Sequence, residues 1–278
     1  MIYCFDTSAL NHLHNDTEVA NLTTGLVVTN TVWITALNVI EVGITEDADR
    51  RSSLLQLQSK LTDDKRPLHI PNRLIRERAA AYAARLDRAA LSVGEEDGVW
   101  IALSNPHLID EVSRQELFRW KKELEDDFCQ AHENARPHFQ QIFDSGTGRP
   151  RTAASLLRHY SGNEDFLFEL TSGIYEKVTG VKLQREELFQ FFRAVPHWPF
   201  FFLGWAYAVY ARAIRQKNFG RNNAGNIDLW CATYLPSCDV FVTADVAQYR
   251  ALRLINTFNR RRTEVLLYSR LRQRLLIN

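Results

Sequence analysis

The chain has 278 residues, of which 45% are hydrophobic and 24% charged, and it contains no internal repeat or low-complexity segment. This composition is typical of a globular protein with one large domain or two small ones. The net charge of +1 excludes a uniformly basic or acidic protein, yet residues 1–200 hold 22 basic and 29 acidic side chains, and residues 201–278 hold 12 and 4. The basic C-terminal quarter would attract phosphate or dock on the acidic remainder of the chain.

The cysteines and the N-terminus both indicate a cytoplasmic protein. The four cysteines form no C-x-x-C pair, so we expect reduced thiols rather than a zinc site. The first residues have neither a basic stretch nor a small-residue cleavage site. Residues 200–211 (FFFLGWAYAVYA) are strongly apolar, but a membrane span needs about 20 residues, so we expect a buried core helix and no membrane association.

The first 46 residues predict strands that alternate with helices. Residues 2–5 (IYCF) are a short apolar run that ends at Asp6, which is typical of a strand buried on both faces of a parallel sheet. Residues 31–35 (TVWIT) predict a second strand, and residues 36–43 predict the helix that follows it. We therefore expect α/β architecture at this end of the chain.

The middle of the chain shows almost no strand pattern and is expected to be helical. Its strongest helix patterns lie at residues 73–91, 113–143, 163–180 and 185–195. The second of these begins with the capping pattern Ser113-x-x-Glu116. Residues 144–151 (DSGTGRPR) form the clearest loop.

The alternation of strands and helices returns near the C-terminus. Residues 240–243 (VFVT) predict a third strand and residues 264–268 (EVLLY) a fourth, with helices expected at residues 223–234 and 246–256. The simplest organisation is an α/β core, a parallel sheet flanked by helices, built from residues 1–46 and 218–278. A large all-α insertion or subdomain then occupies residues 47–217.

Four carboxylates lie at strand ends or in the helices next to them: Asp6, Glu41, Asp228 and Asp245. Because the carboxyl ends of parallel strands share one edge of a sheet, such acids can converge although they are far apart in sequence. Clustered carboxylates repel each other and need a cation, and Mg²⁺ or Mn²⁺ takes oxygen ligands. The pattern predicts a catalytic site with one or two divalent ions that activate water for in-line attack on a phosphodiester, without a side-chain nucleophile.

Each acid also has a purely structural interpretation. Asp6 and Asp245 are placed to cap the helices that follow them. Asn38-x-x-Glu41 resembles a capping box, and Asp228 is placed to face the dipole of a first helical turn. The co-occurrence of all four patterns is harder to explain by chance than any one of them alone, and this favours the catalytic interpretation.

The four acids resemble, in order and local context, the signature of PIN-domain nucleases. That family has a hydrophobic first strand ending in D-[TS]-[SN], a Glu in the helix after the second strand, an Asp in a later helix with small residues one turn on, and a hydrophobic strand ending in T-x-D. The matching segments here are Asp6-Thr7-Ser8, Glu41, Asp228-Leu229-Trp230-Cys231-Ala232 and Val242-Thr243-Ala244-Asp245. They cover about residues 1–45 and 222–270, and Glu41 and Asp228 are 187 positions apart, far more than in a compact PIN domain.

The resemblance implies a PIN-like central parallel sheet and a (ribo)nuclease that depends on Mg²⁺ or Mn²⁺ and cleaves single-stranded RNA. RNA is favoured over DNA on the resemblance alone. Many members of the family are toxins of toxin–antitoxin pairs, so an antitoxin-like regulatory protein partner and a homodimer are also implied. The long insertion departs from the toxin pattern.

Other residues near the acids are candidates for supporting roles. Thr7, Ser8 and Thr243 are placed to hydrogen-bond the acids or bound water, or to act as ordinary turn and cap residues. Four basic residues are candidates for binding nucleic-acid phosphates, or form a solvated helix face. They are Arg212, Arg215, Lys217 and Arg221.

The main alternative function is a non-catalytic PIN-like scaffold or RNA-binding module that works through its helical insertion and uses the acids as caps. A phosphatase-like or nucleotide-binding role for Asp6 lacks the D-x-D pattern, because residue 8 is Ser8. The chain has no H-E-x-x-H, no G-x-x-x-x-G-K-[ST] and no G-x-S-x-G motif. A zinc hydrolase, a P-loop ATPase and the usual serine hydrolase are therefore not supported.

Overall fold

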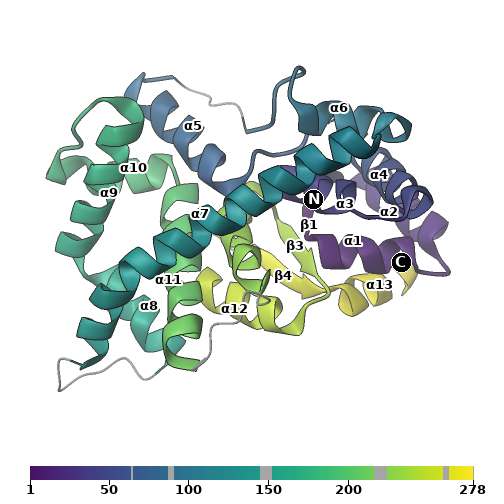
Figure 1. Cartoon of the computed structure of the whole chain (residues 1–278). Coiled ribbons are helices and arrows are strands. Elements are labelled where there is room, and N and C mark those ends of the chain that lie inside the picture. The colour runs from purple at the N-terminus through teal and green to yellow at the C-terminus, as the bar shows by residue number, and fades with distance from the viewer. Residues whose placement is uncertain (64, 87–90, 145–151, 216–223, 259–262, 278) are drawn as a thin grey trace.

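A four-stranded parallel sheet lies at the centre of the computed structural model of the protein (Figure 1). The structure describes residues 1–63, 65–86, 91–144, 152–215, 224–258 and 263–277. The strand order is β2-β1-β3-β4, and every neighbouring pair is parallel. The strands are β1 (Ile2–Phe5), β2 (Thr31–Trp33), β3 (Val240–Thr243) and β4 (Glu264–Leu267). Helices flank this sheet, so the predicted α/β class is confirmed.

The predicted strands are confirmed with small changes at their ends. β2 stops at Trp33, and Thr35 already caps the next helix; β4 stops at Leu267 because Tyr268 begins the last helix. Helices α3 (Ala36–Gly43) and α12 (Val246–Asn256) have the predicted bounds. The remaining α-helices near the two ends are α1 (Thr7–His14), α2 (Val19–Thr29) and α13 (Tyr268–Ile277).

The described part of residues 47–217 is helical, and its strand-type pairing is limited to isolated bridges at Leu68 and Ser92. Its elements are α4 (Ala48–Thr62), α5 (Pro71–Ala83), α6 (Gly98–Ser104), η1 (Pro106–Leu108), α7 (Glu111–Asp144), α8 (Ala153–Gly162), α9 (Glu164–Thr179), η2 (Arg185–Glu187), α10 (Leu188–Ala194) and α11 (His197–Arg215). The predicted cap of α7 was wrong, because Asp110, not Ser113, accepts the hydrogen bond at its start. The predicted loop falls outside the described residues except at Asp144.

The helix predicted at residues 223–234 is instead a 3-10 helix, η3 (Ala224–Ser237). Runs of 3-10 helix longer than about four residues are uncommon, because their hydrogen bonds are poorly aligned. Pro236 lies inside this element. Its close packing against α11 sets its position: a Cβ atom on Gly204 of α11 would collide with the carbonyl oxygen of Leu229.

Alternate side chains of the strands enter two separate cores, one on each face of the sheet. Tyr3 and Phe5 of β1 pack with Val242 of β3 in the core that α1, α2, α3 and α4 cover. Cys4 of β1 and Phe241 of β3 pack in the second core, which α11, α12 and η3 cover. Every residue of β3 is buried, as expected for a central strand of a parallel sheet.

A third hydrophobic core lies within residues 47–217, between α5, α9, α10 and α11. It is centred on fully buried Trp198 and Phe191, whose rings meet edge to face. Phe200 and Phe202 are also buried, so the apolar segment at residues 200–211 contributes to core packing, as predicted. Among the described residues, no helix has both the length and the apolarity to cross a membrane.

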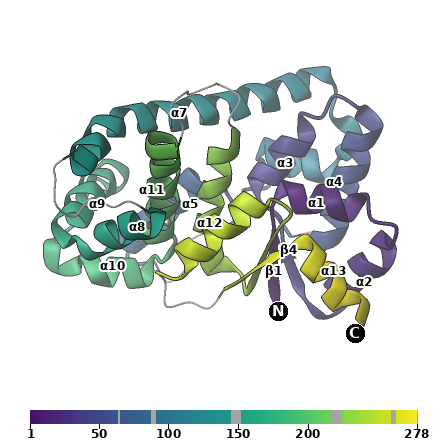
Figure 2. The same ribbon diagram turned by 90° about the horizontal axis from the view of Figure 1, so that it is seen from below.

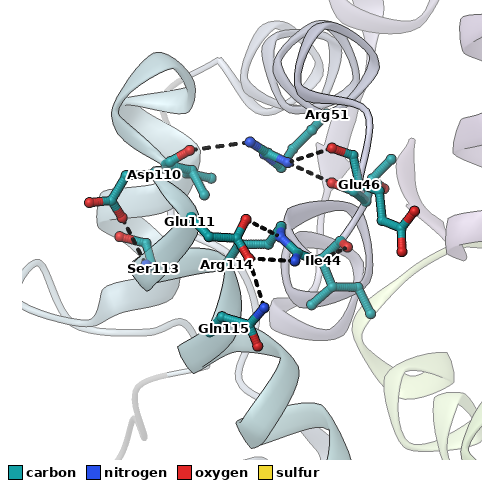
Figure 3. A network of polar contacts seen from close by, with 10 residues as sticks. Ile44, Glu46, Arg51, Asp110, Glu111, Ser113, Arg114 and Gln115 are labelled. Atoms are coloured by element: carbon teal, nitrogen blue, oxygen red, sulfur yellow. Dashed lines mark hydrogen bonds and ion pairs between the residues drawn. The ribbon is translucent and has the colours of Figure 1, made fainter.

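The long helix α7 crosses the molecule from the side of α3, α4 and α6 to the side of α8 and α9 (Figures 1 and 2). Two arginines attach its N-terminal end to the chain that follows α3 (Figure 3). Buried Arg51 donates to the carbonyl oxygens of Thr45, at 2.6 Å, and Ile109, at 3.3 Å. Arg114 of α7 pairs with Glu111 and lies 3.5 Å from the carbonyl oxygen of Ile44. These contacts fix α7 next to α3.

Candidate functional site

The carboxyl ends of β1 and β3 lie side by side at the centre of the sheet. From β1 the chain continues towards β2 on one side, and from β3 it continues towards β4 on the other. Such a change of direction leaves a crevice at the sheet edge, where α/β proteins bind ligands. Asp6 follows β1 and Asp245 comes two residues after the end of β3, so both acids lie at this crevice.

Asp6 is buried, with 8% of its surface exposed, and it caps helix α1. Its Oδ1 accepts a 2.8 Å hydrogen bond from the backbone N–H of Ala9. The hydroxyl group of Ser8 lies 2.9 Å from both carboxylate oxygens, and the hydroxyl group of Thr243 donates to Oδ2 at 2.9 Å. The structural interpretation of Asp6 as a helix cap is therefore confirmed, and three donors fix the orientation of its carboxylate.

Asp245 is exposed and caps helix α12. Its Oδ1 accepts hydrogen bonds from the backbone N–H groups of Ala247, at 2.6 Å, and Gln248, at 2.8 Å. Its own N–H donates to Thr243 Oγ1 at 3.0 Å. The cap interpretation is confirmed here too. Both cap bonds use Oδ1 of Asp245. Within the described part of the chain, Oδ2 takes part in neither bond and is available to another ligand.

Glu41 projects from the second turn of α3 and does not take part in a capping box. Thr35 and Asn38 form the box that starts this helix, so the predicted pairing of Asn38 with Glu41 was wrong. The side chain of Glu41 is three-quarters buried, and its Oε1 lies 3.7 Å from Lys121 Nζ of α7. Glu41 therefore has a charge partner rather than a capping role.

Asp228 lies in η3 but not in its first turn, so its predicted interaction with a helix N-terminus was wrong. Its backbone carbonyl oxygen accepts a 2.9 Å hydrogen bond from Gln248 Nε2 of α12. Its side chain is partly buried. The tight packing of η3 on α11 and this link to α12 place Asp228 opposite Asp6 and Asp245.

The four acids line one cavity of about 210 Å³. The complete lining is Asp6, Thr7, Ser8, Asn11, Leu37, Asn38, Glu41, Asp228, Cys231 and Asp245. Four carboxylates predicted from separate motifs thus converge, although Asp6 and Asp245 are 239 positions apart in the chain. Crowding of this kind is costly for ionised groups in a partly dry site.

The pKa values of two acids show this cost. Burial raises the pKa of Asp6 from 3.8 to about 6, although the hydrogen bonds from Ala9, Ser8 and Thr243 oppose the shift. Burial, followed by repulsion from Glu41, Asp6 and Asp245, raises the pKa of Asp228 from 3.8 to about 7, and Lys121 partly opposes it. A bound cation would favour the ionised form of both acids.

The donor atoms of the cavity are mainly hard oxygen atoms. Cys231 is the exception among the lining residues, but burial raises the pKa of its thiol well above the ordinary value, which disfavours the thiolate needed for a soft-metal ligand. Among the residues that the structure describes, no group of three or more His, Cys, Asp or Glu side chains is arranged to hold a metal ion. The acids share a cavity, but a chelating geometry would require side-chain movement.

The three predicted supporting residues all lie at or beside this cavity, with Thr7 and Ser8 in its lining. Ser8 Oγ accepts a 2.9 Å hydrogen bond from the N–H of Ala244, and Thr243 bridges Asp6 and Asp245. Thr7 Oγ1 accepts a 3.1 Å hydrogen bond from Asn38 Nδ2.

The four predicted basic residues cannot be placed beside the cavity. The side chains of Arg212 and Arg215 and the whole of Lys217 and Arg221 lie outside the described part of the structure. Their binding of nucleic-acid phosphates stays a prediction.

The sequence did not assign Asn11 or Lys121 to the site, and it predicted Asn38 only as a helix cap. Asn11 lies one turn after Ser8 on α1, and Asn38 lies one turn before Glu41 on α3, so helical spacing from the predicted acids was a usable signal. Lys121 had no such signal, because it comes from a polar helix 80 positions after Glu41.

Comparison of the chain with known protein families, curated proteins and solved structures found no match. The resemblance to PIN-domain nucleases therefore remains a prediction based on the four motifs.

Proposed function

We propose that this protein is a PIN-like nuclease that uses divalent cations to hydrolyse phosphodiester bonds, with single-stranded RNA as its preferred substrate. The observation that carries the proposal is the convergence of Asp6, Glu41, Asp228 and Asp245 on one cavity at the carboxyl edge of the parallel sheet. The preference for RNA, an antitoxin-like regulatory partner and a homodimer are predictions that rest on the motif resemblance.

The chemistry of the cavity fits Mg²⁺ or Mn²⁺. Its four carboxylates are ligands that these hard ions prefer. Burial is the main cause that raises the pKa of Asp6 and Asp228, and a bound cation would stabilise their ionised forms. Asp6, Glu41, Asp228 and Asp245 would hold the ion. When bound, a divalent ion would activate water and reduce the negative charge on the phosphate.

The residues of the chain would orient the site for this chemistry. Ser8 and Thr243 fix the carboxylate of Asp6 through hydrogen bonds, and Thr243 also fixes the backbone of Asp245. Asn38 and Thr7 bridge α3 and α1 next to Glu41. Such fixed groups stabilise developing charge at little reorganisation cost.

Cleavage of a labelled single-stranded RNA and of the matching DNA tests the proposal, with Mn²⁺, Mg²⁺ or EDTA present. The expected result is metal-dependent cleavage that Asp6→Asn abolishes, because Asn keeps the size and capping ability of Asp without its charge. Asp49→Asn, at an exposed position of helix α4, is the control for loss of a carboxylate outside the cavity and should retain activity. Equal cleavage by both variants would overturn the proposal.

The second candidate function is a non-catalytic PIN-like scaffold or RNA-binding module. Two observations favour it: Asp6 and Asp245 cap helices, and the described residues hold no ready chelating group. This function predicts RNA binding that neither Mn²⁺ nor EDTA changes, together with no cleavage in any condition.

A further inference from the structure

Lys121 brings a positive charge from the helical insertion to the acidic cavity. Its Nζ lies 3.7 Å from Glu41 Oε1 and 3.7 Å from Glu125 Oε1, and about a quarter of its side chain is exposed. Among the described residues, Lys121 is the one basic side chain that forms a salt bridge with a cavity acid, and that acid is Glu41. Lys121 therefore lies beside Glu41, a lining residue of the cavity, and is partly open to solvent.

The position of Lys121 is fixed by the packing of α7 on α3. Gly43 of α3 lies so close to Leu117 of α7 that a Cβ atom there would displace the tip of the leucine side chain, which shows that the two helices are in direct contact. The hydrogen bonds of Arg51 and Arg114 hold the start of α7 to the segment after α3 (Figure 3). Lys121 lies two helical turns beyond Arg114, on a stretch that these bonds hold in place.

A nucleic acid can reach this cavity only by bringing its phosphates near several carboxylates. Phosphate binding in proteins depends mainly on basic side chains, and a lysine on a flexible stem acts as a movable point charge. The 3.7 Å separation from Glu41 is a loose ion pair rather than a short hydrogen bond, so Lys121 can change partner at small cost. A cation at Glu41 would repel the lysine towards solvent and towards an incoming phosphate.

We propose that Lys121 is a substrate-binding residue of the acidic site, which pairs with Glu41 in the free protein and contacts a phosphate of the bound nucleic acid. This inference rests on the proposed nuclease function and gives the helical insertion a direct role in it. A purely structural role, in which Lys121 only holds α7 to α3, is the competing explanation.

The test measures binding of a fluorescein-labelled single-stranded RNA oligonucleotide over a series of salt concentrations, in the cleavage-deficient Asp6→Asn background. For a single strand, each phosphate that a basic side chain neutralises adds about 0.7 to the slope of log K against log salt. We expect Lys121→Met to weaken binding about tenfold and to reduce this slope by about 0.7. Lys121→Arg should keep both values, as should Lys122→Met, which removes the exposed neighbouring lysine.

An unchanged affinity and salt slope in Lys121→Met would overturn the inference, even if the melting temperature falls, since a structural role alone predicts that pattern. Cleavage by the wild-type protein, measured in parallel, separates the two proposals. If the wild-type protein does not cleave RNA but Lys121→Met still reduces the salt slope of binding, the nuclease function is contradicted and the phosphate interaction is supported. Absence of RNA binding in every variant would overturn the inference.

Discussion

Thr243 Oγ1 donates a 2.9 Å hydrogen bond to Asp6 Oδ2 and accepts a 3.0 Å hydrogen bond from the N–H of Asp245. One hydroxyl group thus joins the acid after β1 to the acid after β3, which are 239 positions apart in the sequence. The threonine is fully buried, so neither bond competes with water.

Thr243→Val should destabilise the protein and weaken cation binding. The change keeps the shape of the side chain but leaves one buried oxygen of Asp6 and the N–H of Asp245 without this partner, at a cost of about 1–3 kcal/mol in the free energy of unfolding. Chemical denaturation and titration with Mn²⁺ measure the two effects. Thr243→Ser keeps the hydroxyl group and should restore most of both values, and equal losses in the two variants would contradict the assigned role.

Stability without divalent ions should fall as the pH rises from about 4 to about 8. The folded-state pKa values of Asp6 and Asp228, about 6 and about 7, lie above the ordinary value of 3.8. The folded state therefore binds more protons, and the stability contributed by these groups is complete below about pH 4 and lost as the pH passes through about 6 and 7. Mn²⁺ should restore stability more at about pH 8 than at about pH 5, because it binds the ionised acids. Equal effects of Mn²⁺ on the melting temperature at both pH values would count against this linkage.

Asp228→Asn should raise the free energy of unfolding in EDTA at about pH 8, by an amount on the order of 2 kcal/mol, because it removes a charge that burial and three neighbouring acids disfavour. Asp16→Asn is the matched comparison outside the cavity. Asp16 Oδ2 accepts hydrogen bonds from Arg272 and Tyr268, and the Arg272 bond lowers the pKa of Asp16 to about 2. This variant should lose stability in the same denaturation experiment. A loss of stability in Asp228→Asn would contradict the proposed repulsion.

The sheet and its acids were predictable because the signals are local. Ile2–Phe5 and Val240–Thr243 are continuous apolar runs, and each ends close to an acid, Asp6 or Asp245, that also caps a helix. The convergence followed from a general property of parallel sheets, that strand ends share one edge. The same local patterns supported both the cap and the metal interpretation. The structure shows that Asp6 and Asp245 cap helices, and a capping carboxylate can also bind a metal ion.

The interactions that complete the site were not predictable, because they join helices that are distant in sequence. Lys121 reaches Glu41, and Arg51 reaches Ile109, only through the packing of α7 on α3 and α4. The 3-10 geometry around Asp228 also gave no signal, since its sequence has the apolar spacing of an ordinary helix. Tertiary packing decides such features over local propensity.

Arg51→Met should weaken the attachment of α7 to the segment after α3. The buried guanidinium donates to backbone carbonyl groups of Thr45, Glu46 and Ile109, and its removal leaves buried acceptors unsatisfied, at a cost of about 2–3 kcal/mol. Arg50→Met, at the exposed neighbouring position, should change the free energy of unfolding by less than about 0.5 kcal/mol. Chemical denaturation measures both, and similar values for the two variants would show that the arginine hydrogen bonds do not hold α7 in place.

Calorimetric titration of the metal-free protein with Mn²⁺ tests most directly whether the four acids form one cation site. We expect saturable binding to the wild-type protein, abolished or strongly weakened in each of Asp6→Asn, Glu41→Gln, Asp228→Asn and Asp245→Asn, and unchanged in Asp49→Asn. Absence of binding to a folded wild-type protein, or binding that the four substitutions leave unchanged, would contradict the proposed site.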